Sequence, residues 1–337
     1  MLFIVLYVVI PVLCLVGIQK RHELKNIFDK NTTLAMRGVG MLFIVFTHMS
    51  KSNLCTETYF FYVSGVIGVA ICFLVSGYGL HISYKRNFCY LERFWIPKIL
   101  RLLLPFWTAY IYYWLSLLIR GESFEMVEVV KNLIAFTFPG VTLWYLKIQL
   151  LMYAIFYFSY RFFKKSWMKI AGVVIATVVY IIVAVAMGLA SFWYNTCLFF
   201  GLGVLLAEYQ DKILPFIRKN WVCVVNSCVF VLIYAILYFF GRMNMDWIID
   251  TVYMLCFCSV LIWFFQRFMR FRILETLGKY SIEIYLFHIV ISGEMFSALR
   301  PAAYILTPLV CVLIGIPVHW GTDQVIKFFK NKKIQEK

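Results

Sequence analysis

Apolar runs of about 17–22 residues, separated by short polar segments, recur along nearly the whole chain. An α-helix rises about 1.5 Å per residue, so about 20 residues cross the roughly 30 Å hydrocarbon core of a bilayer. The pattern therefore predicts an all-α polytopic membrane protein with about eleven transmembrane helices. The predicted spans lie at roughly 1–18, 34–50, 60–82, 102–119, 142–160, 169–188, 191–207, 221–240, 247–265, 277–298 and 302–320.

The composition agrees with this pattern. The 337 residues are 63% hydrophobic and 14% charged, and the mean hydropathy is +0.85. These values exclude an ordinary soluble domain and a disordered chain. The net charge of +16 comes from Lys and Arg in short segments between the apolar runs. This is the positive-inside pattern, so we expect no nucleic-acid partner.

The same charge pattern orients the chain in the cytoplasmic (inner) membrane of a cell, surrounded by membrane lipids, with the N-terminus outside and the C-terminus cytoplasmic. Residues 1–18 come before their nearest basic residues, the reverse of a secretory signal, and predict a leading transmembrane helix. Residues 34–320 form the membrane domain, and residues 321–337 form a basic cytoplasmic tail. The ten cysteines show no metal-ligand spacing, so no metal site is expected.

The predicted helix at 34–50 carries two ionisable residues, Arg37 and His48, which are eleven positions apart. At about 100° and 1.5 Å per residue they share one stripe of the helix, roughly 16 Å apart along its axis. With Arg37 at a membrane boundary, His48 lies past the middle of the bilayer. A buried ionisable group is costly and indicates a functional site. The alternative is a histidine that only bonds to a neighbouring helix.

The span at 277–298 also contains polar residues. Glu283 and His288 are five positions apart, so they point to different sides of a helix and do not form a bonded pair. For His288, a structural and a functional role remain equally open. The other histidines are predicted at boundaries or in loops: His22, His81 and His319.

Five phrases together resemble the acyltransferase-3 family of integral membrane O-acyltransferases, and their order and spacing agree from about 34 to 320. The phrases are the Arg37-to-His48 pattern, CFLVSGYGL with Ser76, Gly77 and Tyr78, KILRLLLPFW with Lys98 and Arg101, TLWYLKIQLLMY with Trp144 and Tyr145, and LGKYSIEIYLFH with Glu283, Tyr285 and His288. The family core has ten spans, which leaves residues 1–18 as an extra leading helix.

The resemblance implies an O-acyltransferase, most simply an O-acetyltransferase, that uses cytoplasmic acyl-CoA such as acetyl-CoA as co-substrate and binds no resident cofactor. The implied acceptor is a hydroxyl of a surface polysaccharide or a glycolipid precursor. One alternative is a polysaccharide flippase or polymerase without acyl-transfer activity, since such proteins also have many spans and buried cations. A second is a membrane acyltransferase that acts on lipids or proteins.

The resemblance also implies residue roles. His48 is the catalytic base or the nucleophile. Arg37, Arg101 and Lys98 hold the phosphates of the donor, although Lys98 stands where the family usually has arginine. Each of these cations can instead serve only as an anchor at a helix end.

Most of the remaining site residues have two interpretations. Ser76, Gly77 and Tyr78 line the donor tunnel or only pack closely. Trp144 and Tyr145 stack on a sugar or belong to the interfacial aromatic belt. Glu283, Tyr285 and His288 support the site from the late span.

Overall fold

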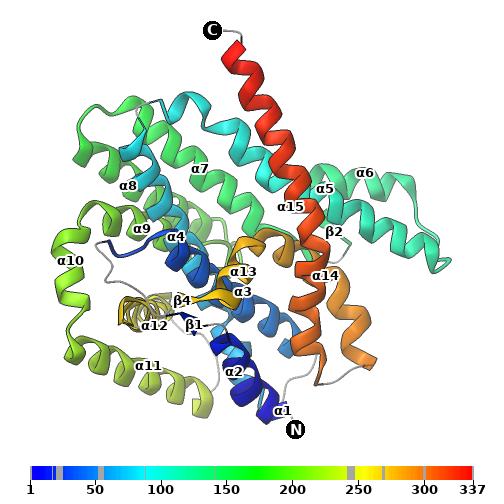
Figure 1. The fold of residues 1–337 in the computed structure, drawn as a ribbon, viewed down its shortest axis with the longest axis horizontal. Coiled ribbons are helices and arrows are strands. Elements are labelled where there is room, and N and C mark those ends of the chain that lie inside the picture. The colour runs from blue at the N-terminus through cyan, green and yellow to red at the C-terminus, as the bar shows by residue number, and fades with distance from the viewer. Residues whose placement is uncertain are drawn as a thin grey trace.

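The computed structural model describes residues 2–16, 18–19, 26–51, 57–87, 89–139, 141–240, 247–267, 270–298 and 301–335. Nearly all of the described chain is helical (Figure 1). The strands are two short antiparallel pairs: β1 (Ile18–Gln19) with β4 (Arg270–Phe271), and β2 (Thr137–Phe138) with β3 (Val141–Thr142). The all-α prediction is confirmed.

Two long helices, α3 (Lys30–Lys51) and α4 (Tyr59–Arg86), lie at the centre of the bundle (Figure 1). The Asp29 carboxylate accepts hydrogen bonds from the backbone N–H and the hydroxyl of Thr32, which satisfies a free donor at the start of α3. The two helices approach closely where Gly40 meets Gly68, because a Cβ at either glycine would overlap the carbonyl oxygen of the other.

The short helix α13 (Arg272–Lys279) also packs closely on α3 through glycines. Gly38 lies against the backbone of Leu274, and Gly278 lies against the backbone of Leu34. Tyr280 then separates α13 from α14 (Ser281–Ala298). The predicted span at 277–298 is therefore two helices. The first of them ends at Lys279, an exposed residue at the edge of the central cavity.

The other helices surround this core. Their bounds are α5 (Trp95–Ile119), α6 (Met126–Ala135), α7 (Trp144–Phe162), α8 (Ser166–Ala186), α9 (Leu198–Glu208), α10 (Gln210–Ile217), α11 (Asn220–Phe240), α12 (Trp247–Arg267) and α15 (Ala303–Gln335). The α5–α6 pair projects to one side, and α15 extends beyond the bundle toward the C-terminus (Figure 1). The predicted tail at 321–337 thus continues α15 through Gln335.

Seven helices among the described residues are long and apolar enough to cross a membrane. They are Lys30–Lys51, Tyr59–Arg86, Leu91–Ile119, Ser166–Ala186, Asn220–Phe239, Trp247–Gln266 and Ala303–Phe329. This agrees with a multi-pass membrane protein, whereas the count of about eleven is not confirmed. The predicted span at 191–207 is a shorter helix, α9, preceded by a single 3-10 turn.

The predicted leading span is a helical segment, Leu2–Leu15, made of α1 (Leu2–Ile4), a π-helical turn (Val5–Val9) and α2 (Ile10–Leu15). At about 1.5 Å per residue it is roughly 20 Å long, shorter than a bilayer core. The Tyr7 hydroxyl donates a 3.0 Å hydrogen bond to the Glu57 carbonyl, which ties the segment to the start of α4.

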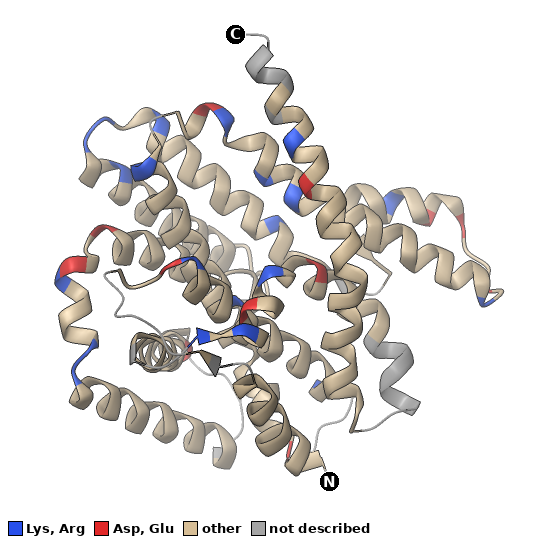
Figure 2. Cartoon of the chain, viewed as in Figure 1, with Lys and Arg blue, Asp and Glu red and all other residues tan. Residues whose placement is uncertain are grey.

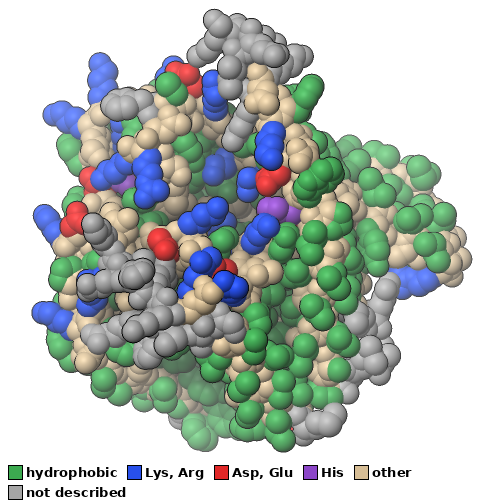
Figure 3. Space-filling view, viewed as in Figure 1, with side chains coloured by type: hydrophobic (Ala, Val, Ile, Leu, Met, Phe, Trp, Pro, Cys, Tyr) green, Lys and Arg blue, Asp and Glu red, His purple; other side chains and the backbone are tan. Residues whose placement is uncertain are grey.

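Charged residues are concentrated at helix ends and connecting segments (Figure 2). One face of the molecule carries a band of basic side chains over its centre and left, and hydrophobic side chains cover its lower right (Figure 3). Two exposed cations, Arg101 and Lys279, also line an internal cavity.

Candidate functional site

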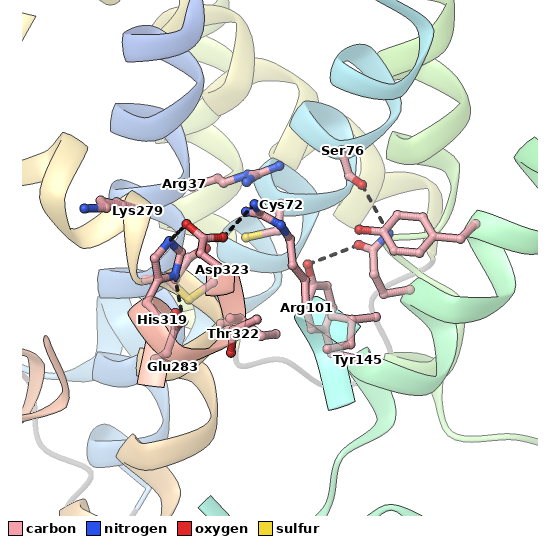
Figure 4. Close-up of a pocket in the computed structure, with 16 residues that line it drawn as sticks. Arg37, Cys72, Ser76, Arg101, Tyr145, Lys279, Glu283, His319, Thr322 and Asp323 are labelled. Carbon is pink, nitrogen blue, oxygen red and sulfur yellow. Dashed lines mark hydrogen bonds and ion pairs between the residues drawn. The ribbon is translucent and has the colours of Figure 1, made fainter. Parts of the chain in front are cut away.

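A cavity of about 110 Å³ lies where α3, α4, α5, α7, α13, α14 and α15 meet (Figure 4). Most of the residues that line it have polar or charged side chains, in contrast to the apolar core around it. The lining residues are Arg37, Met41, Cys72, Ser76, Arg101, Leu102, Tyr145, Gln149, Tyr153, Lys279, Ser281, Ile282, Glu283, His319, Thr322 and Asp323. Five of the predicted site residues are among them: Arg37, Arg101, Ser76, Tyr145 and Glu283.

Three cations from three different helices line this cavity: Arg37 on α3, Arg101 on α5 and Lys279 on α13. Figure 4 shows Arg37 and Arg101 entering from different helices. Guanidinium groups form strong paired hydrogen bonds with phosphate, and Lys adds a point charge. The arrangement therefore suits an anionic ligand. Lys279 was not among the predicted site residues, because the break between α13 and α14 carries no strong sequence signal.

An acid–histidine network forms another part of the wall. His319 Nδ1 donates to Glu283 Oε1 at 2.8 Å, and His319 Nε2 lies 3.8 Å from Asp323 Oδ2. Asp323 Oδ1 in turn accepts a 3.0 Å hydrogen bond from Arg101 Nη2. His319, predicted at a boundary or in a loop, lies on α15 and lines the cavity (Figure 4).

Glu283 is fully buried, and its second oxygen, Oε2, has no hydrogen-bond partner among the described residues. Buried carboxylate oxygens are normally bonded. Because Glu283 lines the cavity, a ligand N–H or O–H group that entered there would find an acceptor.

The wall formed by α4 and α7 is neutral and hydrogen-bonded. Gln149 donates from Nε2 to Ser76 Oγ at 3.1 Å and accepts from the Tyr145 hydroxyl at 3.2 Å. Tyr145 was predicted near the outer boundary, on a sugar or in the aromatic belt, and it instead lines the same cavity as Arg37. These groups can hydrogen-bond a polar but uncharged part of a ligand.

His48 is half-buried on α3 and is not part of the cavity lining. Its ring contacts the ring of His288 on α14, with the two ring centres 5.1 Å apart. His288 lies 6.1 Å from Tyr285, and Tyr285 lies 5.2 Å from Tyr145, again between ring centres. A row of rings thus connects His48 to the cavity wall.

Two predicted site residues lie away from the cavity. Gly77 packs against the backbone of Phe200 on α9, so its role is close packing. The Tyr78 hydroxyl donates to Gln210 Oε1 at 2.7 Å and accepts from the Phe28 N–H at 3.4 Å. Successive helical residues point in different directions, which is why Cys72 and Ser76, about one turn apart, reach the cavity whereas Gly77 and Tyr78 do not.

Two more predicted site residues, Lys98 and Trp144, lie near the cavity but are not among the residues that line it. Lys98 Nζ lies 5.5 Å from the centre of the Tyr153 ring, and Tyr153 lines the cavity. Trp144 packs against Phe192, with ring centres 5.6 Å apart.

His81, predicted at a boundary or in a loop, is buried near the C-terminal end of α4. Its Nε2 donates to Glu208 Oε2 at 2.9 Å, and Tyr160 donates to its Nδ1 at 2.5 Å. Lys85 also pairs with Glu208, at the polar end of α9. Burial raises the pKa of the Glu208 carboxyl, but the hydrogen bonds from Lys85 and His81 outweigh burial, so this pKa lies below its ordinary value. His22 lies outside the described residues.

The fold and the cavity define a multi-pass membrane protein with a charged internal site. Residues 35–321, most of the chain, match the family model described as an acyltransferase domain, Acyl_transf_3. The chain therefore belongs to the acyltransferase-3 family and is an acyltransferase for groups other than aminoacyl groups. Comparison with curated proteins and with solved structures gave no match.

Proposed function

We propose that the protein is an O-acyltransferase of the cytoplasmic membrane. It takes an acyl group, most simply acetyl, from acyl-CoA and transfers it to a hydroxyl of a surface polysaccharide or a glycolipid precursor. The observation that carries this proposal is the cation-lined cavity, which is connected by a row of rings to His48. A flippase or polymerase is not favoured, because the chain belongs to an acyltransferase family.

The cavity suits the donor. Arg37, Arg101 and Lys279 offer bonds to the phosphates of CoA, and Lys98 adds positive potential from behind Tyr153. A cavity of about 110 Å³ is too small for a whole CoA, so the thioester arm enters it, the phosphates lie at its mouth beside these cations, and the adenosine lies on the basic face outside it. By the positive-inside rule this face is cytoplasmic, where acyl-CoA is available.

The polar groups of the wall match the amides of the pantetheine arm. Glu283 Oε2 can accept an amide N–H, and Ser76, Gln149 and Tyr145 can bond the amide carbonyls or the thioester. Along this wall the acyl group approaches Tyr285 and then His48.

His48 then acts on the acceptor. As base, it takes the proton of the acceptor hydroxyl while the oxygen attacks the thioester carbon. The C–S bond breaks, and the proton on His48 passes to the thiolate of CoA. As nucleophile, His48 first forms an acyl-imidazole, which the hydroxyl then attacks. Both routes give one ester and one CoA thiol.

Two experiments test the function. Mass spectrometry of surface glycans from cells with and without the gene should show the loss of one acyl increment in its absence, and a His48→Ala gene should not restore it. Purified protein in lipid nanodiscs should transfer label from acetyl-CoA to an extracted acceptor, and His48→Ala should not. Unchanged glycans in the deletion strain, together with no transfer by the purified protein, would contradict the proposal.

A further inference from the structure

His288 has an unusual hydrogen-bonding state. It is fully buried in α14, and its Nδ1 lies 3.0 Å from the carbonyl oxygen of Ile284. A carbonyl only accepts, so Nδ1 carries the proton and Nε2 of the neutral ring carries a lone pair. This Nε2 has no hydrogen-bond partner among the described residues. Buried acceptors are normally satisfied, so a structural role alone does not account for this atom.

The neighbour that can satisfy this acceptor is His48. The ring centres of His48 and His288 are 5.1 Å apart. A ring nitrogen lies about 1.1 Å from the centre of an imidazole, so two imidazoles joined by an N–H···N bond of about 2.9 Å have centres about 5 Å apart. The separation is therefore that of a bonded pair, and a rotation of the rings completes the contact. Hydrogen bonds of catalytic groups commonly tighten only when substrate is bound.

We propose that His288 is the positioning residue of His48. Its Nε2 accepts the N–H of His48, which fixes the tautomer of His48 and aims the lone pair of the other nitrogen at the reacting groups. The proposal rests on the proposed function and extends it to a second histidine. When His48 takes the acceptor proton, the His48 imidazolium keeps its bond to His288 Nε2, and His288 keeps its own proton on Nδ1. The proton then leaves on the CoA thiol, so neither ring changes its charge over the full cycle.

Among the described residues, no carboxylate contacts either imidazole ring, so none competes with His288 for the N–H of His48. The titratable groups near the pair are Lys51 on α3 and Tyr285 on α14, and Tyr304 on α15 contacts Phe46, two residues before His48. Most metal-bound or catalytic imidazoles are oriented by a carboxylate or a carbonyl. Here a second imidazole, itself oriented by the Ile284 carbonyl, takes that place.

The test uses full-length protein in nanodiscs, with transfer from acetyl-CoA measured between pH 5.5 and 8.5. His288→Phe keeps a ring but removes the acceptor, so kcat should fall about 10- to 100-fold while the KM for acetyl-CoA stays within about two-fold, as expected for loss of an outer-shell bond. The bond stabilises protonated His48, so its loss should also move the acidic limb of the kcat profile to lower pH. His288→Gln, whose amide oxygen can accept the same N–H, should recover part of kcat and of the profile.

His81→Gln is the matched control, because His81 is also a buried histidine but bonds to Glu208 and Tyr160. Its kcat profile should keep the wild-type limb. An active His48→Ala would overturn both the catalytic assignment and this inference. An inactive His48→Ala together with wild-type kcat and profile in His288→Phe would overturn this inference alone. If His288→Phe does not fold, His288→Ala takes its place as the variant without an acceptor. A wild-type kcat with an unshifted acidic limb in His288→Ala would overturn the inference.

Discussion

His319 donates a 2.8 Å hydrogen bond to Glu283, a residue 36 positions earlier in the chain and on a different helix. The pair joins α14 to α15 at the cavity, and the second oxygen of Glu283 has no hydrogen-bond partner among the residues that the structure describes. The carboxylate also lowers the net positive charge of a cavity that holds Arg37, Arg101 and Lys279. The bond thus serves the packing of two helices and the electrostatics of the site together.

Arg37 and Arg101 should bind the donor phosphates. Replacing either by Ala should raise the KM or Kd for acetyl-CoA by about 10- to 100-fold, because a hydrogen bond to a charged group contributes about 1.5–3 kcal/mol. Isothermal titration with CoA in nanodiscs measures this. Arg120→Ala, at the far end of α5, is the control and should leave the affinity unchanged. Unchanged CoA binding in both cavity variants would contradict the donor assignment.

Asp323 competes with the donor for Arg101. The pair is 3.0 Å long and partly exposed, and such ion pairs are worth about 0.2–1 kcal/mol. Asp323→Asn should therefore increase the affinity for CoA by roughly two- to five-fold. The gain should depend on Arg101, so the double variant with Arg101→Ala should show none. Weaker CoA binding in Asp323→Asn would show that Asp323 supports the donor site instead.

Two glycines on α4 provide a test of close packing. A Cβ at Gly77 would overlap the backbone of Phe200, whereas a Cβ at Gly79 would meet no atom within 4 Å. Gly77→Ala should lower the thermal unfolding temperature in detergent, because two backbones must separate. Gly79→Ala should leave it unchanged or raise it, since Ala is favoured over Gly in a helix by about 0.5–1 kcal/mol. Equal behaviour of the two variants would contradict the packing of α4 on α9.

The Glu208 cluster should make stability depend on pH. The pKa of Glu208 is lower in the folded protein, so its contribution is fully present above the unfolded pKa of about 4.3 and is lost as pH falls through the folded pKa. The unfolding temperature should drop on acidification below about pH 4.3 in the wild type and drop less in Glu208→Gln. The control Glu122→Gln, at an exposed ion pair with Arg120, should follow the wild type.

The hydrophobic pattern predicts the helical membrane fold and the central helix that carries Arg37 and His48, because both depend on local periodicity. It predicts the cavity less completely. Lys279 lines the cavity at the end of α13, just before the break to α14, and His319, inside the predicted span at 302–320, reaches it because α15 packs against α14 there. Tertiary contacts decide the positions of both side chains. The ring contact of His48 with His288 likewise depends on how α3 and α14 pack, which periodicity alone cannot specify.

The pairing of β1 with β4 joins Ile18 to Phe271, so it closes a loop that includes most of the protein. Contacts between such distant positions form late, because the intervening chain must be ordered first. During synthesis, Ile18 and Gln19 are therefore made long before the strand that pairs with them exists. Once the β1–β4 pair has formed, it fixes the segment just before α13 and therefore the position of the helix that carries Lys279.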